Sequence, residues 1–464
     1  MRRRILMDLS TSLQWRGKHA VGIVRTEREI ARRLLLDDDV DVVPVAFHAG
    51  RFFAIDPEQA MRLVSPSSST AAIQSAPPVV GGLKAPVPFR LRARVLRPAG
   101  AFARFCARGI IGAMPTSVAD EVRLAMIHGR QAARNFLYPE PKAAEVDRTV
   151  ARKIDMPSDA PIDLRFVVHP TDRDVLFLGG LGWDVIDCRN VAAIKRQTGM
   201  KVSCVIYDLI PTKFPNYLGG DPRDYFFNYF LHMVDLADHV FCISKTTQGD
   251  FYEFCDLQSR AHTPSSVIYL GANLPVASDS AEIPEEIRGR LRDGKYAFAV
   301  GTVEIRKNYE LLLSLWEKLA EDPAFELDLV IAGMAGWGTE KFIERLESSP
   351  LFGKRIFWFR RLSDSGISWL YEHCCMHVFP SWYEGWGLPV VEALQHKKPV
   401  IASNRGSVPE AGFGVATIID PDDHEAWADA IRQFAKETPQ MPEVSLPTWD
   451  QAAAEVKSRL FEIQ

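Results

Sequence analysis

The chain has 464 residues, of which 47% are hydrophobic and 25% are charged, and its formal net charge is −4. This length can supply two or three domains with substantial cores, and the composition is ordinary for a soluble globular protein. The slightly negative charge gives no global reason to expect nucleic acid as a partner. The seven cysteines show no metal-ligand spacing, which favours reduced thiols in a cytosolic compartment.

The beginning of the chain predicts no signal peptide. Three arginines follow Met1, but the apolar run of residues 5–7 is too short for a signal sequence and Asp8 interrupts it. No apolar run approaches the length of a membrane span. We therefore expect a cytoplasmic protein.

The first half opens with the strand, loop and helix that begin a doubly wound α/β sheet. Residues 4–9 predict a strand, a loop with Gly17 and Gly22 follows, and residues 24–36 have the periodicity of an amphipathic helix. The glycine spacing is not that of a dinucleotide fingerprint, so this loop can be a plain turn. Further strands are expected at residues 40–47, 51–53, 174–180, 201–208 and 239–243, a helix at 225–237, and an N-cap at Ser244.

Residues 89–134 form a basic segment within an expected insertion at about residues 65–150. Arginines greatly outnumber acids in this segment, and leucine, phenylalanine and isoleucine lie between them. The pattern is typical of an element on an anionic membrane surface, but a cationic helical insertion that covers the sheet has the same pattern. Both hypotheses stay open. The Ser-, Ala- and Pro-rich residues 65–88 before it predict a loop.

The second half repeats the α/β pattern after a polar, acidic stretch, residues 277–293, that predicts an interdomain linker. Arg306 and Lys307 lie in a loop between an expected strand and an expected helix. A guanidinium fork beside an ammonium point charge makes a good phosphate clamp, although adjacent cations are also common in surface loops. Strands are expected at residues 296–300, 327–333, 355–359, 377–380 and 400–403, and helices at 309–320 and after Trp449.

Residues 376–400 combine a strand, a glycine-containing loop and a helix that is expected to start at Pro389. Such a helix start points free N–H groups and its dipole at the loop, which makes an anion site. Glu384 lies in the loop and Glu392 about one turn inside the helix, and carboxylates there suit hydroxyl groups better than phosphate. A phosphate site between two carboxylates that bind hydroxyl groups matches the arrangement of groups in a nucleotide-sugar. Taken singly, Glu392 is an ordinary helix residue.

Three stretches resemble the family 4 glycosyltransferases, which are retaining enzymes of the GT-B fold. Residues 381–393, with YEGWGLPVVEA, resemble the E-x7-E signature of that family, and residues 300–308 resemble its diphosphate-binding loop. The segment DLIP at residues 208–211 resembles an H-D-L-x-P segment, although Tyr207 stands where a histidine is common. Because a phenol carries no positive charge near neutral pH, any electrostatic role of that histidine is in doubt here. The combined pattern is similar to bacterial polysaccharide mannosyltransferases.

The resemblance implies a fold and an assignment of roles. The expected fold is GT-B, with two Rossmann-like doubly wound domains facing a cleft: residues 1–276 for the acceptor, residues 290–445 for the donor, and a terminal helix within 446–464 that crosses back to the first domain. The residues that the resemblance places in the reaction are Arg306 and Lys307 on the departing diphosphate, Glu384 on the sugar, and Asp208 on a sugar hydroxyl. A turn cap is the plain alternative for Asp208.

Further residues are implied as donor contacts. Glu392 would accept hydrogen bonds from the ribose, the loop at 385–388 would hold the sugar, and residues 360–362 would hold the base largely through backbone. The donor-binding set is Gly22, Thr302, Arg361, Leu362, Gly385, Trp386, Gly387, Leu388 and Glu392.

The expected function is retaining transfer of a hexosyl group from a nucleoside-diphosphate sugar to a hydroxyl of a glycan or lipid-linked glycan in bacterial polysaccharide synthesis. GDP-mannose is the favoured donor. We expect no metal, because no Asp-x-Asp follows an apolar strand, and no cofactor besides the donor substrate. An epimerase or phosphorylase on the same fold, or a non-catalytic subunit that binds sugar nucleotides, stays an alternative. The expected location is cytoplasmic, and peripheral on the inner membrane face if the basic segment binds lipid.

Overall fold

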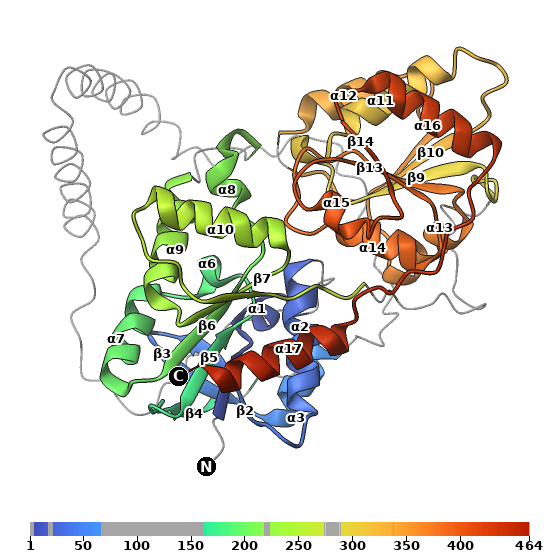
Figure 1. The fold of residues 1–464 in the computed structure, drawn as a ribbon. Coiled ribbons are helices and arrows are strands. Elements are labelled where there is room, and N and C mark those ends of the chain that lie inside the picture. Colours follow the sequence, from blue (N-terminus) through green and yellow to red (C-terminus); the bar gives the residue numbers. More distant parts are fainter. Residues whose placement is uncertain are drawn as a thin grey trace, which may run out of the picture. The chain divides into compact units, whose positions relative to one another are not determined.

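A computed structural model describes residues 4–16, 22–65, 162, 164–217, 223–272, 274, 287, 289–336 and 338–463. The basic segment and most of the expected linker lie outside these residues. Two β-sheets, each with its own helices, make up the described chain (Figure 1).

The first sheet has the strand order β4-β3-β2-β1-β5-β6-β7-β8. All neighbouring pairs are parallel except β2–β3 and β3–β4. Within the parallel part, the chain order reverses between β1 and β5, which is the topological switch point of this sheet. The strands are β1 (Arg4–Asp8), β2 (Asp41–His48), β3 (Arg51–Ile55), β4 (Leu164–Val168), β5 (Asp174–Leu178), β6 (Lys201–Ile206), β7 (His239–Cys242) and β8 (Ser265–Val267).

Two helices of the first half show the capping chemistry that their sequences predict. The Ser244 hydroxyl accepts a hydrogen bond from the Thr247 N–H at 2.9 Å and starts α10, which confirms the predicted N-cap. Gly199, with φ of 75°, ends α7. The helices are α1 (Ser10–Gln14), α2 (Ile23–Leu35), α3 (Pro57–Val64), α6 (Gly182–Val185), α7 (Cys188–Thr198), α8 (Ile210–Lys213), α9 (Arg223–Leu236) and α10 (Lys245–Leu257).

The second sheet is parallel throughout and has the order β11-β10-β9-β12-β13-β14. Numbered along the chain this is the order 3-2-1-4-5-6 of a Rossmann sheet, with its switch point between β9 and β12. The strands are β9 (Tyr296–Val300), β10 (Asp328–Ala332), β11 (Ile356–Phe359), β12 (Met376–Phe379), β13 (Val400–Ser403) and β14 (Thr417–Ile419). The helices are α11 (Tyr309–Leu319), α12 (Glu340–Ser348), α13 (Asp364–His373), α14 (Leu388–Gln395), α15 (Val408–Ala411) and α16 (His424–Lys436), with a 3₁₀ turn, η3, at Ile305–Lys307.

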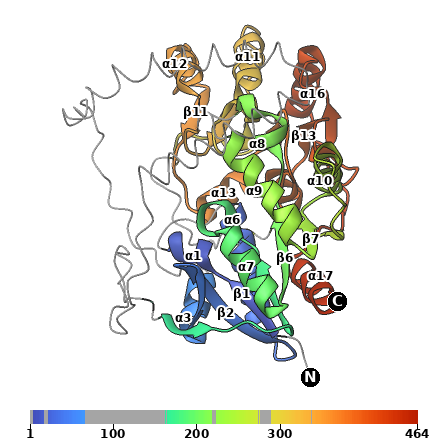
Figure 2. The same ribbon diagram turned by 90° about the vertical axis from the view of Figure 1, so that its left-hand side faces the viewer.

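The core of the second half lies between this sheet and its helices. Every residue of β9, β10, β12 and β13 is buried, as expected for a parallel sheet covered on both faces. Helices α11 and α16 lie side by side over one face, with Trp316 and Trp427 fully buried beneath them, and α13 and α14 lie on the opposite face (Figures 1 and 2).

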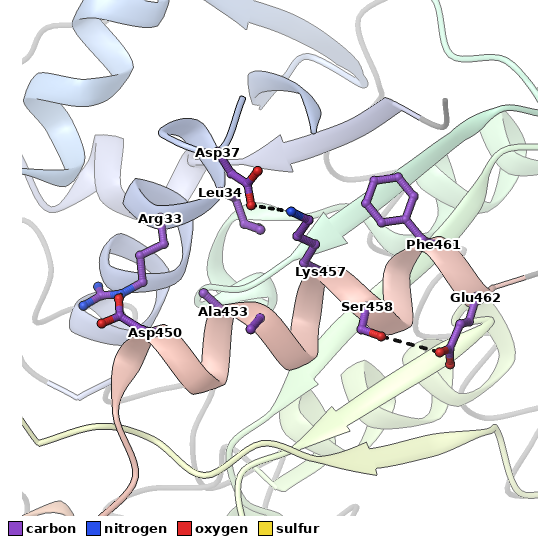
Figure 3. A pocket seen from close by; sticks show the side chains of 10 residues that line it. Arg33, Leu34, Asp37, Asp450, Ala453, Lys457, Ser458, Phe461 and Glu462 are labelled. Carbon is purple, nitrogen blue, oxygen red and sulfur yellow. Dashed lines mark hydrogen bonds and ion pairs between the residues drawn. The ribbon is translucent and has the colours of Figure 1, made fainter. Parts of the chain in front are cut away.

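The last helix, α17 (Trp449–Glu462), returns to the first half and packs on α2. Lys457 pairs with Asp37 at the end of α2, and Arg33 pairs with Asp450 (Figure 3). A capping box at Thr448 fixes the start of α17. A surface pocket lies between these two helices and is lined by Arg33, Leu34, Asp37, Asp450, Ala453, Ala454, Lys457, Ser458, Phe461 and Glu462.

The structure confirms the predicted fold class, two Rossmann-like α/β halves of the GT-B type. Predicted strands recur within one or two residues, and β9 and β13 have the predicted bounds. Two details were wrong. Helix α14 begins at Leu388 rather than at Pro389, because Gly387 is its N-cap, and the edge strands β4, β8 and β14 were not expected. No helix among the described residues is long and apolar enough to cross a membrane.

Candidate functional site

Two loops meet at the switch point of the second sheet. The cation loop, residues 301–308, follows β9, and the motif loop, residues 380–387, follows β12. Because β9 and β12 are parallel neighbours, both loops leave the same carboxyl edge, which is where open α/β sheets bind ligands. Direct bonds join them: Trp382 N–H donates to the Arg306 carbonyl at 2.8 Å, and the Asn308 side-chain amide donates to the Pro380 carbonyl at 3.2 Å.

Arg306 and Lys307 converge on one carboxylate. Lys307 Nζ lies 2.6 Å from Glu384 Oε1, and Arg306 Nη1 lies 2.6 Å from Glu384 Oε2. Arg306 also donates to the Tyr383 carbonyl and pairs with Glu304 at 2.6 Å. The structure thus brings together three of the residues predicted to act in the reaction. It also adds an ion pair, with Glu384 between the two cations, that the sequence did not indicate.

These charged side chains are largely buried, and each charge shifts the pKa of its neighbours. The Glu384 side chain is 9% exposed, and although burial alone would raise its pKa, the charges of Arg306 and Lys307 lower it to about 2. Burial lowers the pKa of Lys307 while Glu384 opposes that effect. The close contacts and the low carboxyl pKa describe a buried ion cluster in which the opposite charges stabilise one another.

The motif loop passes so close to the first half that a side chain at Gly385 has no room. A Cβ there would lie 2.1 Å from the Tyr207 carbonyl oxygen and 2.9 Å from Asp208 Cβ. Gly387, with φ of 111°, needs glycine for a different reason, since that conformation is strained for other residues. Leu388 follows it as the first residue of α14, whose first turn leaves backbone N–H groups without partners inside the helix.

Asp208 lies where β6 ends, against the motif loop. Its carboxylate accepts a hydrogen bond from the Ile210 N–H at 3.0 Å, so the plain role of capping a turn is present. Burial raises the pKa of Asp208, and the nearby charge of Arg306 opposes this. The neighbouring Tyr207 is buried, donates to the Gly179 carbonyl and has a pKa raised well above its usual value, so it is a neutral group.

Residues of the first half that sequence reasoning missed hold the motif loop in place. The Ser244 hydroxyl donates to the Gly385 carbonyl at 2.6 Å and that of Thr247 donates to the same oxygen at 3.0 Å. Beside the motif loop, Glu410 of α15 in the second half accepts from the Lys245 N–H and the Tyr269 hydroxyl of the first half, both at 2.9 Å. Only the N-cap role of Ser244 was visible in the sequence, because local patterns carry no signal for these long-range bonds.

Trp386 is part of this packing. Its indole is buried and stacks on Tyr269, with ring centroids 5.1 Å apart and planes at 27°. The side chain therefore serves the contact between the loop and the first half.

Glu392 lies on the first turns of α14 and is nearly buried. Arg25 Nη1 of α2 donates to its Oε1 at 3.1 Å, and the Tyr371 hydroxyl of α13 donates to its Oε2 at 3.2 Å. Burial raises the pKa of Glu392, and the charge of Arg25 opposes that effect. Arg25 was not expected in the site.

The other predicted donor residues lie on loops. Gly22 has φ of 50° directly before α2, and nothing lies within 4 Å of a Cβ built there, so backbone conformation alone favours glycine. Thr302 is exposed in the cation loop, and its methyl group packs against Gly336. Arg361 and Leu362 follow β11, at the same edge of the sheet as the two loops. Among the described residues no group of three or more His, Cys, Asp or Glu side chains is placed to hold a metal.

Comparison with known proteins gives a partial match. Residues 282–444 match the family described as "Glycosyl transferases group 1". The chain is 29% identical over 215 residues to the serotype-specific mannosyltransferase WbdA of Escherichia coli. This match covers 44% of this chain and 26% of that protein. It is 34% identical over 141 residues to the O-antigen chain mannosyltransferase B of Escherichia coli, covering 30% of this chain and 36% of that protein.

A human relative is matched over a longer stretch. The chain is 27% identical over 290 residues to the human alpha-1,3/1,6-mannosyltransferase ALG2, covering 57% of this chain and 67% of that protein. The chain spans about a quarter to two thirds of the length of these three relatives. The matched family domain includes both the cation loop and the motif loop.

Proposed function

We propose that the chain is a retaining glycosyltransferase that moves a hexosyl group from a nucleoside-diphosphate sugar to a hydroxyl group. The observation that carries the proposal is the convergence of Arg306 and Lys307 on Glu384 at the switch point of the second sheet. Two buried cations aimed at one point, beside the start of α14, suit the two phosphates of such a donor. The family match over residues 282–444 supports the same reaction class.

The cations act on the leaving group. When the bond between the anomeric carbon and the diphosphate oxygen breaks, negative charge grows on that oxygen, and fixed positive groups lower the barrier by neutralising it. A diphosphate bound to Arg306 and Lys307 takes the place of the Glu384 carboxylate. The displaced carboxylate is then free to accept hydrogen bonds from the sugar hydroxyls.

The acceptor hydroxyl attacks on the face from which the diphosphate leaves. Its oxygen forms the new bond to the anomeric carbon, the bond to the diphosphate breaks, and the hydroxyl proton passes to the departing phosphate oxygen. Asp208, beside Arg306 and Gly385, accepts a hydrogen bond from the transferred sugar. Glu392 accepts from the ribose, and residues 360–362 hold the base.

The favoured donor is GDP-mannose, and the favoured acceptor is a hydroxyl of a glycan or a lipid-linked glycan in bacterial polysaccharide synthesis. The support is that all three relatives carry the name mannosyltransferase and one is named for the O-antigen chain. No metal takes part in this reaction.

The test is incubation of the purified chain with GDP-mannose or UDP-glucose and a panel of glycan acceptors, with products followed by mass spectrometry and proton NMR. Transfer with the anomeric configuration retained is expected, with a large loss in Lys307→Ala and none in Lys318→Ala, an exposed lysine on α11. Formation of an epimer, release of a sugar phosphate in phosphate buffer, or tight binding without turnover would each replace the proposal with one of the three alternatives.

A further inference from the structure

Helix α2 of the first half supplies a cation to the second half. Arg25 Nη1 contacts Glu392 Oε1 at 3.1 Å, and Arg25 Nη2 contacts Asp364 Oδ1 at 2.8 Å, so one guanidinium bridges α14 and α13. The Arg25 side chain is 15% exposed. A guanidinium has a planar fork of donors, and holding two carboxylates at once leaves it little freedom to move.

The groups around Glu392 explain why the contact with Arg25 matters for the charge of its carboxylate. The Glu392 side chain is 9% exposed, Asp364 adds a like charge, and the Tyr371 hydroxyl is a neutral donor. On the elements packed around it, His396, the C-cap of α14, stacks on the Tyr371 ring at 5.3 Å, and His377 of β12 lies 5.4 Å from that ring. Burial lowers the pKa of both histidines, so they are neutral near pH 7.

We propose that Arg25 is a positioning residue through which helix α2 of the first half completes the ribose subsite of the second half. The inference rests on the proposed function, because it assigns Glu392 to the ribose of the donor. Arg25 holds the Glu392 carboxylate in one orientation, and its charge offsets the burial that raises the pKa of this group. An ionised carboxylate in a fixed orientation can accept hydrogen bonds from two adjacent ribose hydroxyls.

The bridge also ties the start of α2 to Glu392. Arg25 is the third residue of α2, three positions after Gly22, so the start of α2 moves with the guanidinium. Because coupling between sites is reciprocal, a nucleotide that binds Glu392 better when Arg25 is in place also holds the start of α2 in place.

The experiment is calorimetric titration of the full chain with GDP, and in parallel with UDP, between pH 5.5 and pH 8. Arg25→Met is compared with wild type, with Arg25→Lys, and with Arg33→Met, which removes an arginine of the same helix with a similarly buried side chain, 16% against 15% exposed, without touching Glu392. Glu392→Gln is measured alone and combined with Arg25→Met. The ionisation of the nucleotide phosphate affects every variant alike and cancels in these comparisons.

We expect Arg25→Met to bind GDP about tenfold more weakly at pH 7, the lower end of what a hydrogen bond to a charged group contributes. The deficit grows as the pH falls, because without Arg25 the Glu392 carboxyl takes up its proton at a higher pH. Arg25→Lys restores part of the affinity, Arg33→Met behaves as wild type, and the pH-dependent deficit disappears in the Glu392→Gln background. Arg25→Gln, which keeps a hydrogen-bond donor, carries the test if the Met variant does not fold.

An Arg25 variant that binds GDP as wild type does at every pH overturns the inference. A loss of GDP affinity that is equal at every pH and persists in the Glu392→Gln background also overturns it. That result would mean that Arg25 only holds the helices together and does not act through the Glu392 carboxylate. Failure of the wild type to bind either GDP or UDP overturns the proposed function, and the inference with it. The two failures are therefore distinguishable.

Discussion

Replacing Glu384 by glutamine is the sharpest single test of the ion cluster. The change keeps the shape of the side chain but removes the negative charge between Arg306 and Lys307, each 2.6 Å from the carboxylate. Two like charges would then face each other in a buried site. Removing one member of a buried ion pair in this way is strongly destabilising, because the remaining charge is left without compensation.

The expected loss of folding stability follows from the pKa of the Glu384 carboxyl. A fall from the ordinary value of 4.5 to about 2 corresponds to about 3 kcal/mol of folding stability, because one pKa unit is worth about 1.4 kcal/mol. Since folding lowers this pKa, the stabilisation is complete above pH 4.5 and is lost as the pH falls toward 2. At pH 7 the Glu384→Gln variant is therefore expected to be about 3 kcal/mol less stable than wild type.

The assay is urea unfolding at pH 7 followed by tryptophan fluorescence. Glu304→Gln is the matched control, because Glu304 forms an ion pair with Arg306 and its side chain is 25% exposed. That variant should lose less than about 1 kcal/mol. A second measurement separates stability from binding: with the competing carboxylate gone, Glu384→Gln should bind GDP at least as tightly as wild type while transfer falls. Equal stability of the two variants would refute the account of the cluster.

Further predictions address the leaving group, the loop, the metal and the basic segment. Lys307→Ala should lower turnover by roughly 10²–10³ in a folded protein, measured in steady-state transfer assays, and near-normal turnover would contradict its role on the diphosphate. Gly385→Ala should cost about 1–3 kcal/mol in urea unfolding and should abolish transfer, because its Cβ meets the Tyr207 carbonyl at 2.1 Å; Gly249→Ala, in open space on α10, is the control and should not destabilise. Treatment with EDTA should leave transfer intact, and a loss reversed by metal would show a different donor site. Residues 89–134 lie outside the described structure. If they bind membranes, the chain should sediment with anionic but not with neutral vesicles. The bound fraction should fall at high salt and after serine replaces Arg90, Arg92, Arg94 and Arg97.

The sequence by itself determined the local features of this protein. The apolar runs that became β9, β12 and β13 are visible because a strand buried on both faces needs consecutive apolar residues. The spacing of Glu384 and Glu392 around a glycine loop and a helix start is also local, and so is the pair Arg306–Lys307. These patterns were sufficient to place the fold class and most of the candidate site.

Only the tertiary structure decided which of these groups meet. The order β11-β10-β9-β12 makes the cation loop and the motif loop neighbours, and that proximity turns Glu384 into the partner of two cations 77 and 78 positions earlier in the chain. Arg25 reaches Glu392 across 367 positions, and Ser244 reaches Gly385 across 141. Periodicity and propensity describe neighbours along the chain, whereas ion pairs and hydrogen bonds depend on distances that only the packing of two sheets sets. For this reason Arg25 was invisible in the sequence, and so was the packing of Trp386 against Tyr269.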